Sequence, residues 1–523
     1  MVKKKQSRNL VVVLGDQLNH DSAAFDGFDP NVDHVWMAEA DDEATNVWSH
    51  KYRLVGFFSP MRHFRDEMRA NGKNVIYHQL SSEVTTDYAG SLSDLLEKTL
   101  SDHSFERVIF VQPGDYRVRT SLHECIARSG VVMEERSDRT FYCSIDRFAD
   151  WAQGRQSFVL EQFYRVMRRE HQVLMRDEKN PIGDAWNFDK ENRGKFGKSG
   201  PGDIPQPPSF QPDEITCEVI ELVESRFSDH PGKTEGFNLP VTRVEALQML
   251  DDFVVHRLPS FGTYQDAMWS GEEFLYHSRL SHALNLKLLS PREVVQSAVE
   301  RYEQGQSPIN SVEGFVRQIL GWREYVRGIY WTRMPEYASL NSLECDENQN
   351  VPSFFWDGKT DMACVSDAMR LLINTAYAHH IQRLMVLGLY AQLLGVHPRH
   401  FNDWHLAMYA DAIDWVSLPN TLGMSQHADG GIMATKPYCA SGSYIDRMGN
   451  FCKTCKYSPK KAVGEDACPF TTLYWDFLDR HQKRFKGNHR MVMQYKNLER
   501  KDSDELVQIR KRAQQIKTNE LSV

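Results

Sequence analysis

The sequence predicts an α/β domain with a parallel, Rossmann-like sheet in residues 1–140 and a large all-α domain in residues 241–523. Residues 141–240 connect the two domains. Short apolar runs alternate with helical patterns in the first part, which is typical of a parallel sheet. Helical periodicity without a strand-like run fills the last part. The chain of 523 residues is also too long for a single hydrophobic core.

Composition indicates a globular enzyme. Hydrophobic residues make up 41% of the chain and aromatic residues 11%. The net charge of −9 argues against a general polyanion binder, so any contact with nucleic acid needs a local basic surface. Nine cysteines do not form a disulfide scaffold in a chain of this length. The apolar run Leu10–Leu14 is too short for a signal peptide, and no run reaches the roughly 18 residues of a membrane span. We expect a cytoplasmic protein without a membrane anchor.

The predicted sheet places several polar residues at the ends of its strands. The expected strands are Leu10–Leu14, His34–Ala38, Val75–His78, Val108–Val111 and Val131–Glu134, and the clearest helices between them are Trp48–Ala70, Ser91–Leu100 and Ser121–Arg128. Parallel sheets bind ligands beyond the carboxyl ends of their strands. Gly15, Asp16 and Gln17 follow the first strand, and Glu39 follows the second. No GxGxxG motif is present, so a dinucleotide site is not supported. A loop-capping role for Asp16 and Gln17 remains open.

The connector contains one expected helix and one expected loop. Phe158–Met175 is amphipathic, and Gly194–Pro212 is rich in Gly, Pro, Lys and Ser without periodicity. Basic residues in this loop and just before it could approach a phosphate backbone, although a solvated loop is the alternative. These residues are Lys190, Arg193, Lys195 and Lys198.

A helical pattern from Cys364 to Met385 is the central stretch of the all-α domain. Its apolar stripe is interrupted by a histidine and consists of Met369, Ile373, Ala376, His380 and Leu384. A histidine on a buried stripe is most often a hydrogen-bonded core residue. Here, however, Trp356-x-Gly358-x-Thr360 precedes the stretch, and the segments that contain Asp411 and Asn420 follow it.

Three cysteines near the C-terminus have metal-ligand spacing. Cys452-x-x-Cys455 is followed after twelve residues by Cys468-Pro469. Such thiolates converge on one ion or cluster, and a fourth ligand is still required. The candidates are Cys345, Cys364, Cys439 and a histidine. Spacing alone leaves both zinc and an iron–sulfur cluster open.

These motifs together resemble the photolyase/cryptochrome family, in particular its bacterial iron–sulfur (6-4) subgroup, nearly from end to end. The flavin-helix pattern of the family is nearly present in Trp356, Gly358, Thr360, Asp367, Ala368, Met369 and Arg370. The order Tyr377-Ala-His379-His380-Ile-Gln-Arg383 resembles the histidine-bearing helix of (6-4) photolyases. Some positions depart from the pattern: Asp361 replaces a glycine and Ala363 a proline.

The resemblance implies an FAD site in the all-α domain. Its expected contacts are Tyr264, His277, Ser278, Arg279, Leu280, Ser281, Trp322, Arg383, Asp411 and Asn420. His277 replaces the usual threonine of the flavin-phosphate segment. Backbone N–H groups and hydroxyls at a helix start suit a pyrophosphate. The expected catalytic residues are His380 as proton donor, His379 and Gln318.

The resemblance also implies the other cofactors and the substrate. A 6,7-dimethyl-8-ribityllumazine antenna is expected at Gly15, Asp16, Gln17 and Glu39, and a 4Fe-4S cluster at Cys364, Cys452, Cys455 and Cys468. Trp356 and Trp404 match members of an aromatic electron route, in which His405 stands where close relatives can have tyrosine. Tyr438 is the expected aromatic contact to UV-damaged DNA, where it could fill the gap left by a flipped nucleotide.

The implied function is light-dependent repair of (6-4) pyrimidine–pyrimidone photoproducts by a monomeric enzyme. An electron passes from reduced FAD to a flipped-out lesion, and His380 donates a proton. A cryptochrome-like blue-light receptor with the same cofactors is the main alternative. A DNA-binding iron–sulfur protein would explain the cysteines but not the flavin motifs.

Overall fold

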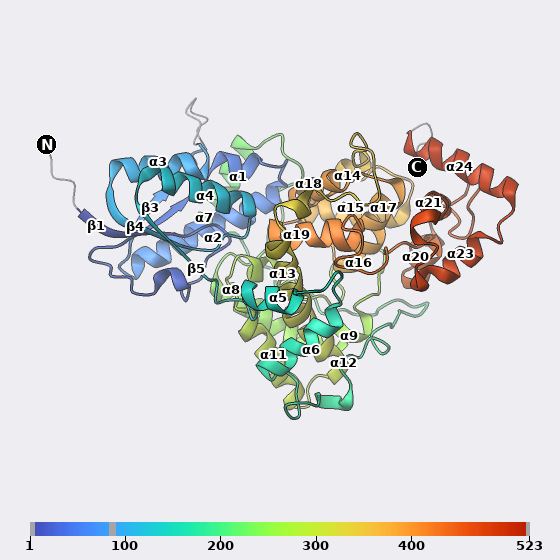
Figure 1. Ribbon diagram of the computed structural model, residues 1–523, viewed down its shortest axis with the longest axis horizontal. Coiled ribbons are helices and arrows are strands. Elements are labelled where there is room, and N and C mark those ends of the chain that lie inside the picture. Colours follow the sequence, from blue (N-terminus) through green and yellow to red (C-terminus); the bar gives the residue numbers. More distant parts are fainter. Residues whose placement is uncertain (1–5, 83–89, 519–522) are drawn as a thin grey trace.

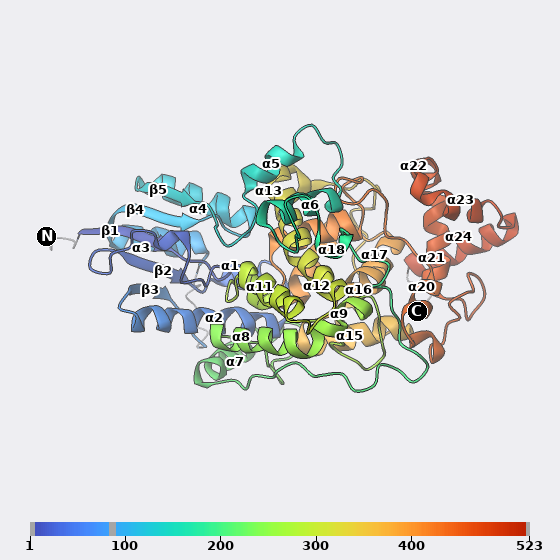
Figure 2. The same ribbon diagram turned by 90° about the horizontal axis from the view of Figure 1, so that it is seen from below.

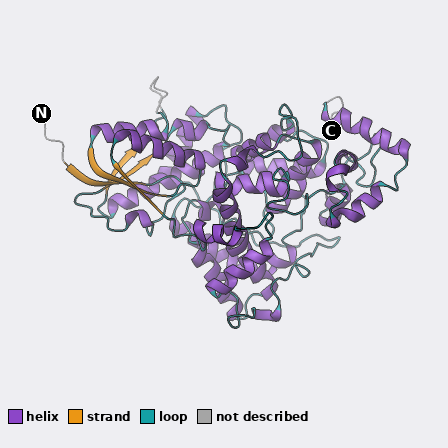
Figure 3. Ribbon diagram, viewed as in Figure 1, coloured by secondary structure: helices purple, strands orange, loops and turns teal. Residues whose placement is uncertain are grey.

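The computed structural model describes residues 6–82, 90–518 and 523. The chain runs from an α/β domain at the left of Figure 1, through a central mass of helices, to a C-terminal helical layer at the right. Strands occur only at the N-terminal end of the described chain, as the colouring of Figure 3 makes plain. This arrangement confirms the predicted fold class.

The α/β domain is built on one five-stranded parallel sheet in the order β3-β2-β1-β4-β5. The strands are β1 (Gln6–Val12), β2 (His34–Ala38), β3 (Asn74–His78), β4 (Ser104–Val111) and β5 (Val132–Arg136). The three central strands are the most apolar and the most buried, as expected of a sheet covered on both faces. The flanking helices are α1 (Asp41–Thr45), α2 (Lys51–Ala70), α3 (Leu92–Asp102) and α4 (Tyr116–Ser129). All five predicted strands and three predicted helices are therefore present, although α2 begins three residues later than expected.

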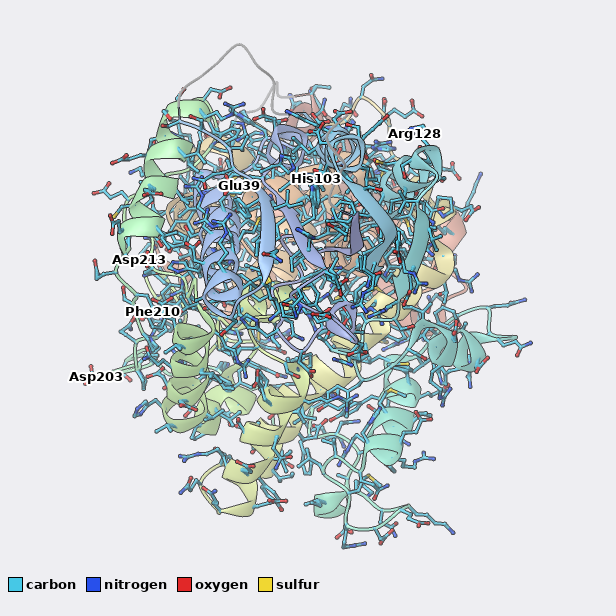
Figure 4. All side chains as sticks on the ribbon, turned by 90° about the vertical axis from the view of Figure 1, so that its left-hand side faces the viewer. Glu39, His103, Arg128, Asp203, Phe210 and Asp213 are labelled. Carbon is cyan, nitrogen blue, oxygen red and sulfur yellow. The ribbon has the colours of Figure 1, made fainter. Side chains whose placement is uncertain are left out.

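The connector leaves the sheet and returns to it. Its helices α5 (Ile145–Ala152) and α6 (Leu160–His171) pack on the helical domain, against α13 (Glu324–Arg333) and η4 (Arg317–Arg323) respectively. Residues 194–212 form the expected loop, and they run along the lower edge of the molecule in Figure 2. In Figure 4, Asp203, Phe210 and Asp213 lie one above another along the left-hand side of the molecule, with Asp203 lowest and Asp213 highest. The chain then enters α7 (Glu214–Arg226), which packs on α2.

The regular elements of the remaining described residues are helices joined by loops, and they form two layers. The first layer contains α8 (Arg243–Asp252), η3 (Phe253–Arg257), α9 (Leu258–Tyr264), α10 (Ser281–Asn285), α11 (Pro291–Glu303), α12 (Ile309–Val316), η4 (Arg317–Arg323), α13 (Glu324–Arg333), α14 (Phe354–Asp357), α15 (Ala363–Thr375), α16 (His380–Gln382), η6 (Arg383–Gly388), α17 (Leu389–Leu394), α18 (Pro398–Met408), α19 (Asp414–Leu418) and η7 (Pro419–Ser425). The C-terminal layer contains α20 (Gly442–Met448), α21 (Pro469–Arg480), α22 (Gln482–Phe485), α23 (Val492–Leu498) and α24 (Ser503–Lys517). Among the described residues, no helix combines the length and the apolar character needed to span a bilayer.

The predicted continuous helix from Cys364 to Met385 is wrong. Helix α15 ends at Thr375, and Ala376 adopts a left-handed conformation with φ of 49°. The carbonyl of Ala376 accepts a hydrogen bond from the amide of Ala410, at 2.9 Å, in place of the next helical turn. A new helix, α16, starts at His380. His380 and Leu384 therefore do not continue the stripe of Met369 and Ile373.

Two buried histidines join the domains. The His50 Nε2 atom lies 2.9 Å from the carbonyl oxygen of Ile373 in α15. The His282 Nε2 atom of α10 lies 2.9 Å from the carbonyl oxygen of Gly56 in α2. Both imidazoles are almost fully buried, and burial is the main reason that the pKa of each falls to about 4. Neutral imidazoles therefore hold the domain boundary.

Candidate functional site

A buried ion pair lies at the centre of the candidate flavin site. Arg383 binds both carboxylate oxygens of Asp411, at 2.9 and 3.1 Å. The Ser281 hydroxyl also donates to this carboxylate, at 2.5 Å. Burial alone would raise the pKa of Asp411, but Arg383 and Ser281 outweigh it, so the pKa lies below its usual value. Three residues predicted from distant segments are thus in direct contact.

Three histidines gather beside this pair. The rings of His277 and His379 are stacked, with centroids 4.5 Å apart and planes 10° from parallel. Burial is the largest cause of a pKa of about 3 for His277 and of a pKa for His379 well below the usual value. His379 has no hydrogen-bond partner among the described residues on either ring nitrogen. The two stacked rings are therefore neutral, and the ring nitrogens of His379 are left without a hydrogen bond from the described protein.

His380 does not lie on a buried apolar face, contrary to its place in the predicted stripe. It is exposed at the start of α16, whereas its neighbour His379 is buried. The reason is the break at Ala376, which rotates His380 away from the apolar face of α15. The surrounding protein and the Arg383 charge still lower its pKa to about 4. His380 therefore combines solvent access with a neutral imidazole at neutral pH.

The polar groups around the ion pair fit a flavin dinucleotide. Several buried atoms lack a hydrogen-bond partner among the described residues, and they are His277 Nε2, Arg279 Nε, both ring nitrogens of His379, His405 Nδ1 and the Tyr409 hydroxyl. Native proteins rarely leave so many buried polar atoms unpaired, so this group suits a ligand rich in acceptors and donors. Arg257, which the sequence did not reveal, extends the set. It is fully buried beside Asp252, at 2.8 Å, and its pKa is lowered by burial and by the charge of Arg279.

Four π-helical segments carry candidate residues in the described chain. Arg257 ends η3, Gln318 and Trp322 lie in η4, Arg383 begins η6, and Asn420 lies in η7. Single π-turns are uncommon and often occur at functional sites, because the extra residue re-aims the side chains. The Gln318 amide donates to the carbonyl of Gly314, at 3.1 Å, and that of Asn420 to the carbonyl of Val416, at 2.7 Å.

The other predicted flavin residues lie near the same helices. Ser278, Arg279 and Leu280 precede α10, and Arg279 has a positive φ of 58°. Tyr264 is stacked between Phe196 and Tyr276, with centroids 4.6 and 5.6 Å away. Tyr438 is half-buried in the loop before α20, and burial raises its pKa.

The four predicted cysteines surround one small cavity. Cys364, Cys452, Cys455 and Cys468 all line it, together with Met362, Gly442, Ile445, Phe451, Tyr457 and Phe470. About 300 Å³ of space free of protein atoms, part of it open to solvent, lies between these residues. Burial and the three other thiols raise the pKa of Cys364 well above its usual value. Cys345 and Cys439, the alternative fourth ligands, do not line this cavity.

The lining fits a metal cluster better than a single ion. A Cβ atom on Gly442 would lie 2.7 Å from the Cys468 sulfur, so only glycine leaves that side of the cavity open. Among the described residues, no three metal-binding side chains stand close enough to hold one ion. Four sulfurs around a cavity, instead of around a point, are the donor set of an iron–sulfur cluster.

The predicted electron-route tryptophans occupy different depths. Trp404 is 1% exposed, and its indole N–H donates to the carbonyl of Phe355, at 2.8 Å. Its ring centroid lies 5.9 Å from that of Tyr409, whose ring is covered by the Arg383 guanidinium. Trp356 is half-buried and lies against Trp48, with ring centroids 5.0 Å apart. Sequence reasoning did not reveal Trp48, because a lone aromatic residue in a turn carries no pattern.

A second, larger pocket of about 990 Å³ lies at the carboxyl ends of the strands. Gly15, Asp16, Arg53 and Gly114 are among its lining residues, together with Asp414 from the helical domain. Burial and the neighbouring Asp115 raise the pKa of Asp414 to about 7, and burial raises that of Asp16. The pocket therefore combines apolar walls with a few carboxyls and the guanidinium of half-buried Arg53, the composition of a small-molecule site.

Gln17 and Glu39 do not line this pocket. The Gln17 amide donates to the carbonyls of Val111 and Gln112, both at 3.1 Å. Glu39 accepts bonds from Arg62, at 2.8 and 3.0 Å, and from Tyr77, at 2.6 Å. Figure 4 marks Glu39 within the sheet layer. Both side chains are thus bonded within the domain.

Comparison with known proteins identifies the relatives of this chain. The profile of the family described as deoxyribodipyrimidine photo-lyase-related protein matches residues 11–239. A (6-4) photolyase of Agrobacterium fabrum is 44% identical over 497 residues, which cover 95% of this chain and 96% of that protein.

Solved structures share the fold at low sequence identity. A bacterial class III photolyase from Agrobacterium tumefaciens aligns with a TM-score of 0.55 at 15% identity, over 95% of this chain and 98% of its own. The cryptochrome of Synechocystis sp. PCC6803 aligns with a TM-score of 0.56 at 12% identity, over 99% and 100% of the two chains. With the (6-4) photolyase as a relative along nearly its whole length, the chain belongs to the photolyase/cryptochrome family.

Proposed function

We propose that this protein is a light-dependent enzyme that repairs (6-4) photoproducts in UV-damaged DNA. One observation carries the proposal. The buried Arg383–Asp411 pair and the three histidines beside it form an incompletely bonded polar site, in a chain 44% identical to a (6-4) photolyase. Such a site suits a bound flavin, and an exposed histidine next to it suits a substrate that arrives from solvent.

FAD is the proposed cofactor of this site. Arg383, Asp411, Ser281 and Asn420 would hold the isoalloxazine end, while Arg257 and Arg279 supply positive charge for the diphosphate. When bound in its reduced form, FAD supplies the light-driven electron for the lesion. The role of the chain is to orient these polar groups in advance and to keep the ion pair dry.

His380 is the proposed proton donor. Its pKa of about 4 leaves little imidazolium at neutral pH in the free protein, so the proton must be stabilised by the substrate. The phosphates of a bound lesion supply negative charge near an exposed imidazole and would raise this pKa. A ring nitrogen of His380 would then give its proton to the transferred hydroxyl or oxygen. Buried His379 supports the ring stack with His277 and is the less direct participant.

The cysteine cavity is the proposed site of a 4Fe-4S cluster, and the pocket at the strand ends is the proposed antenna site. Cluster ligation would tie α15 to the C-terminal layer, because Cys364 and Cys468 come from these two parts. A lumazine would meet Gly15 and Asp16 in the antenna pocket, whereas Gln17 and Glu39 would act through the structure around it.

A repair assay tests the proposed function against a receptor role. We expect His380→Ala to abolish restoration of a (6-4) oligonucleotide under blue light, while photoreduction of the flavin continues, because His380 lies outside the aromatic contacts of Trp404. His379→Ala should have a smaller effect. A wild-type protein that photoreduces normally but leaves the (6-4) oligonucleotide unrepaired would instead support the blue-light receptor.

A further inference from the structure

We propose that Trp48, contributed by the α/β domain, is the solvent end of the aromatic route that delivers electrons to the flavin site. The inference rests on the proposed function, since it assumes a photoreducible flavin beside Arg383. It adds a residue from another domain to the two tryptophans that the sequence indicated.

Trp48 is placed in contact with both the route and water. Its ring centroid lies 5.0 Å from that of Trp356, with the planes at 49°. All eleven tryptophans lie in the described part of the chain, and Trp48, at 46% exposure, is the only one that is exposed. An indole that is half in water and half on another indole can exchange an electron with both.

The contact is built into the domain boundary. Two residues after Trp48, the His50 amide donates to the carbonyl of Ala407 in α18, at 2.8 Å. The His50 ring reaches the carbonyl of Ile373 in α15, at 2.9 Å. Ser49 accepts a bond from His230 on its carbonyl, at 2.7 Å. These bonds fix the turn that carries Trp48 on α18, the helix of Trp404, and on α15, which packs against the short helix α14 of Trp356.

A short bonded path continues from Trp356 to the buried site. The Trp404 indole N–H donates to the carbonyl of Phe355, and the carbon of that carbonyl is bonded to the amide nitrogen of Trp356. Trp404 then contacts Tyr409, which lies under the Arg383 guanidinium. One hydrogen bond and a few covalent bonds thus join the two indoles.

His405 gives an independent reason to place the solvent end of the electron route at another residue. Burial lowers its pKa to about 3, so the ring beside Trp404 is a neutral imidazole, which is harder to oxidise than a phenol or an indole. A route that ended at His405 would stop inside the protein, because this residue is 8% exposed. Trp48 provides an oxidisable ring at the surface instead.

The electron count balances with a thiol as donor. For each electron that Trp404 passes inward, Trp404 takes one from Trp356, and Trp356 takes one from Trp48. The two inner rings therefore undergo no net change. The Trp48 radical cation takes one electron from an external thiol. The thiol proton goes to solvent, and two thiyl radicals combine as a disulfide.

The test compares Trp48→Phe with Trp331→Phe, a half-buried tryptophan on α13 outside the route. Flavin-loaded proteins are illuminated with blue light and limiting thiol, and flavin reduction is followed by absorbance. A second readout omits the thiol and maps oxygenated tryptophan by peptide mass spectrometry in wild type and Trp356→Phe. The second readout needs no variant at Trp48.

We expect Trp48→Phe to slow photoreduction several-fold at unchanged flavin content, and Trp331→Phe to match wild type. Light-dependent oxygenation should concentrate at Trp48 and fall in Trp356→Phe, because a diffusible oxidant would not require Trp356. Wild-type photoreduction in Trp48→Phe, or equal oxygenation of Trp48 in wild type and Trp356→Phe, would overturn the inference. A wild type that binds no photoreducible flavin would instead refute the proposed function.

Discussion

Acid should weaken the boundary between the two domains through His50 and His282. The perturbation is a change of pH from 8 to 5, combined with the double variant His50→Gln and His282→Gln. A glutamine amide can still donate to the carbonyls of Ile373 and Gly56, but it does not titrate in this range. The histidines prefer the neutral form when folded, because burial lowers both pKa values to about 4.

The sign and size follow from linkage. Between pH 6.5 and pH 4 the unfolded chain binds protons that the folded protein does not, so stability falls as pH falls and levels off below about 4. A shift from 6.5 to about 4 costs each histidine about 2 kcal/mol at pH 5 relative to pH 8. The pair therefore contributes about 4 kcal/mol of pH dependence.

Urea unfolding at the two pH values measures this contribution. The free energy of unfolding of wild type should fall by about 4 kcal/mol more than that of the double variant over the same interval. The double variant is less stable at pH 8 in any case, so only the difference in pH dependence is informative. An equal loss in both proteins would refute the assignment of neutral, buried histidines to the domain boundary.

Three further predictions concern the cofactor sites. Cys364→Ala should lose most of the bound iron measured after anaerobic purification. The control variant Cys125→Ala, which removes a buried thiol of the sheet domain, should keep its iron. Cys364→Ala protein with a full iron content would exclude Cys364 as a ligand. Gly114→Ala should release the lumazine and keep the flavin in absorption spectra, since the new Cβ would lie 2.3 Å from an Asp16 oxygen in the antenna pocket; unchanged lumazine content would place the antenna elsewhere. Asp411→Asn leaves the buried Arg383 without its carboxylate, which lowers the stability of the protein by roughly 3–5 kcal/mol and should lower its flavin content. Full flavin occupancy and unchanged thermal stability would contradict a central role for the ion pair.

The sheet domain could be predicted closely because its signals are local. Apolar strand runs such as His34–Ala38 are bounded by polar turns, and the observed β2 has the same bounds. The role of Glu39 was harder to predict. Its strand-end position is that of a ligand contact, but its charge is used by Arg62, which projects from the buried face of α2. An arginine within an apolar helical face was the signal that a buried partner existed.

The break at Ala376 could not be predicted because no strong helix breaker marks it and the apolar periodicity continues across it. The stretch around it contains neither glycine nor proline, and the helix is stopped by a hydrogen bond from Ala410, which is distant in sequence. The same break exposes His380, so the error in the secondary structure became an error in its burial. Arg257 and Trp48 escaped detection for a related reason, since π-turns and single surface contacts leave no periodic pattern.

Helix α15 has a consequence for oxygen sensitivity. Its 13 residues span about 20 Å, with Cys364 at one end and the turn to His379 and His380 at the other. Backbone hydrogen bonds make a helix of this length stiff along its axis. Oxidative loss of the proposed cluster would therefore remove the restraint at the Cys364 end of the helix. A shift of that end would pass along the helix axis to the histidine segment, opposed by the bond between His50 and Ile373. Exposure to air would then lower the proposed light reaction without modifying any of the residues proposed to hold the flavin.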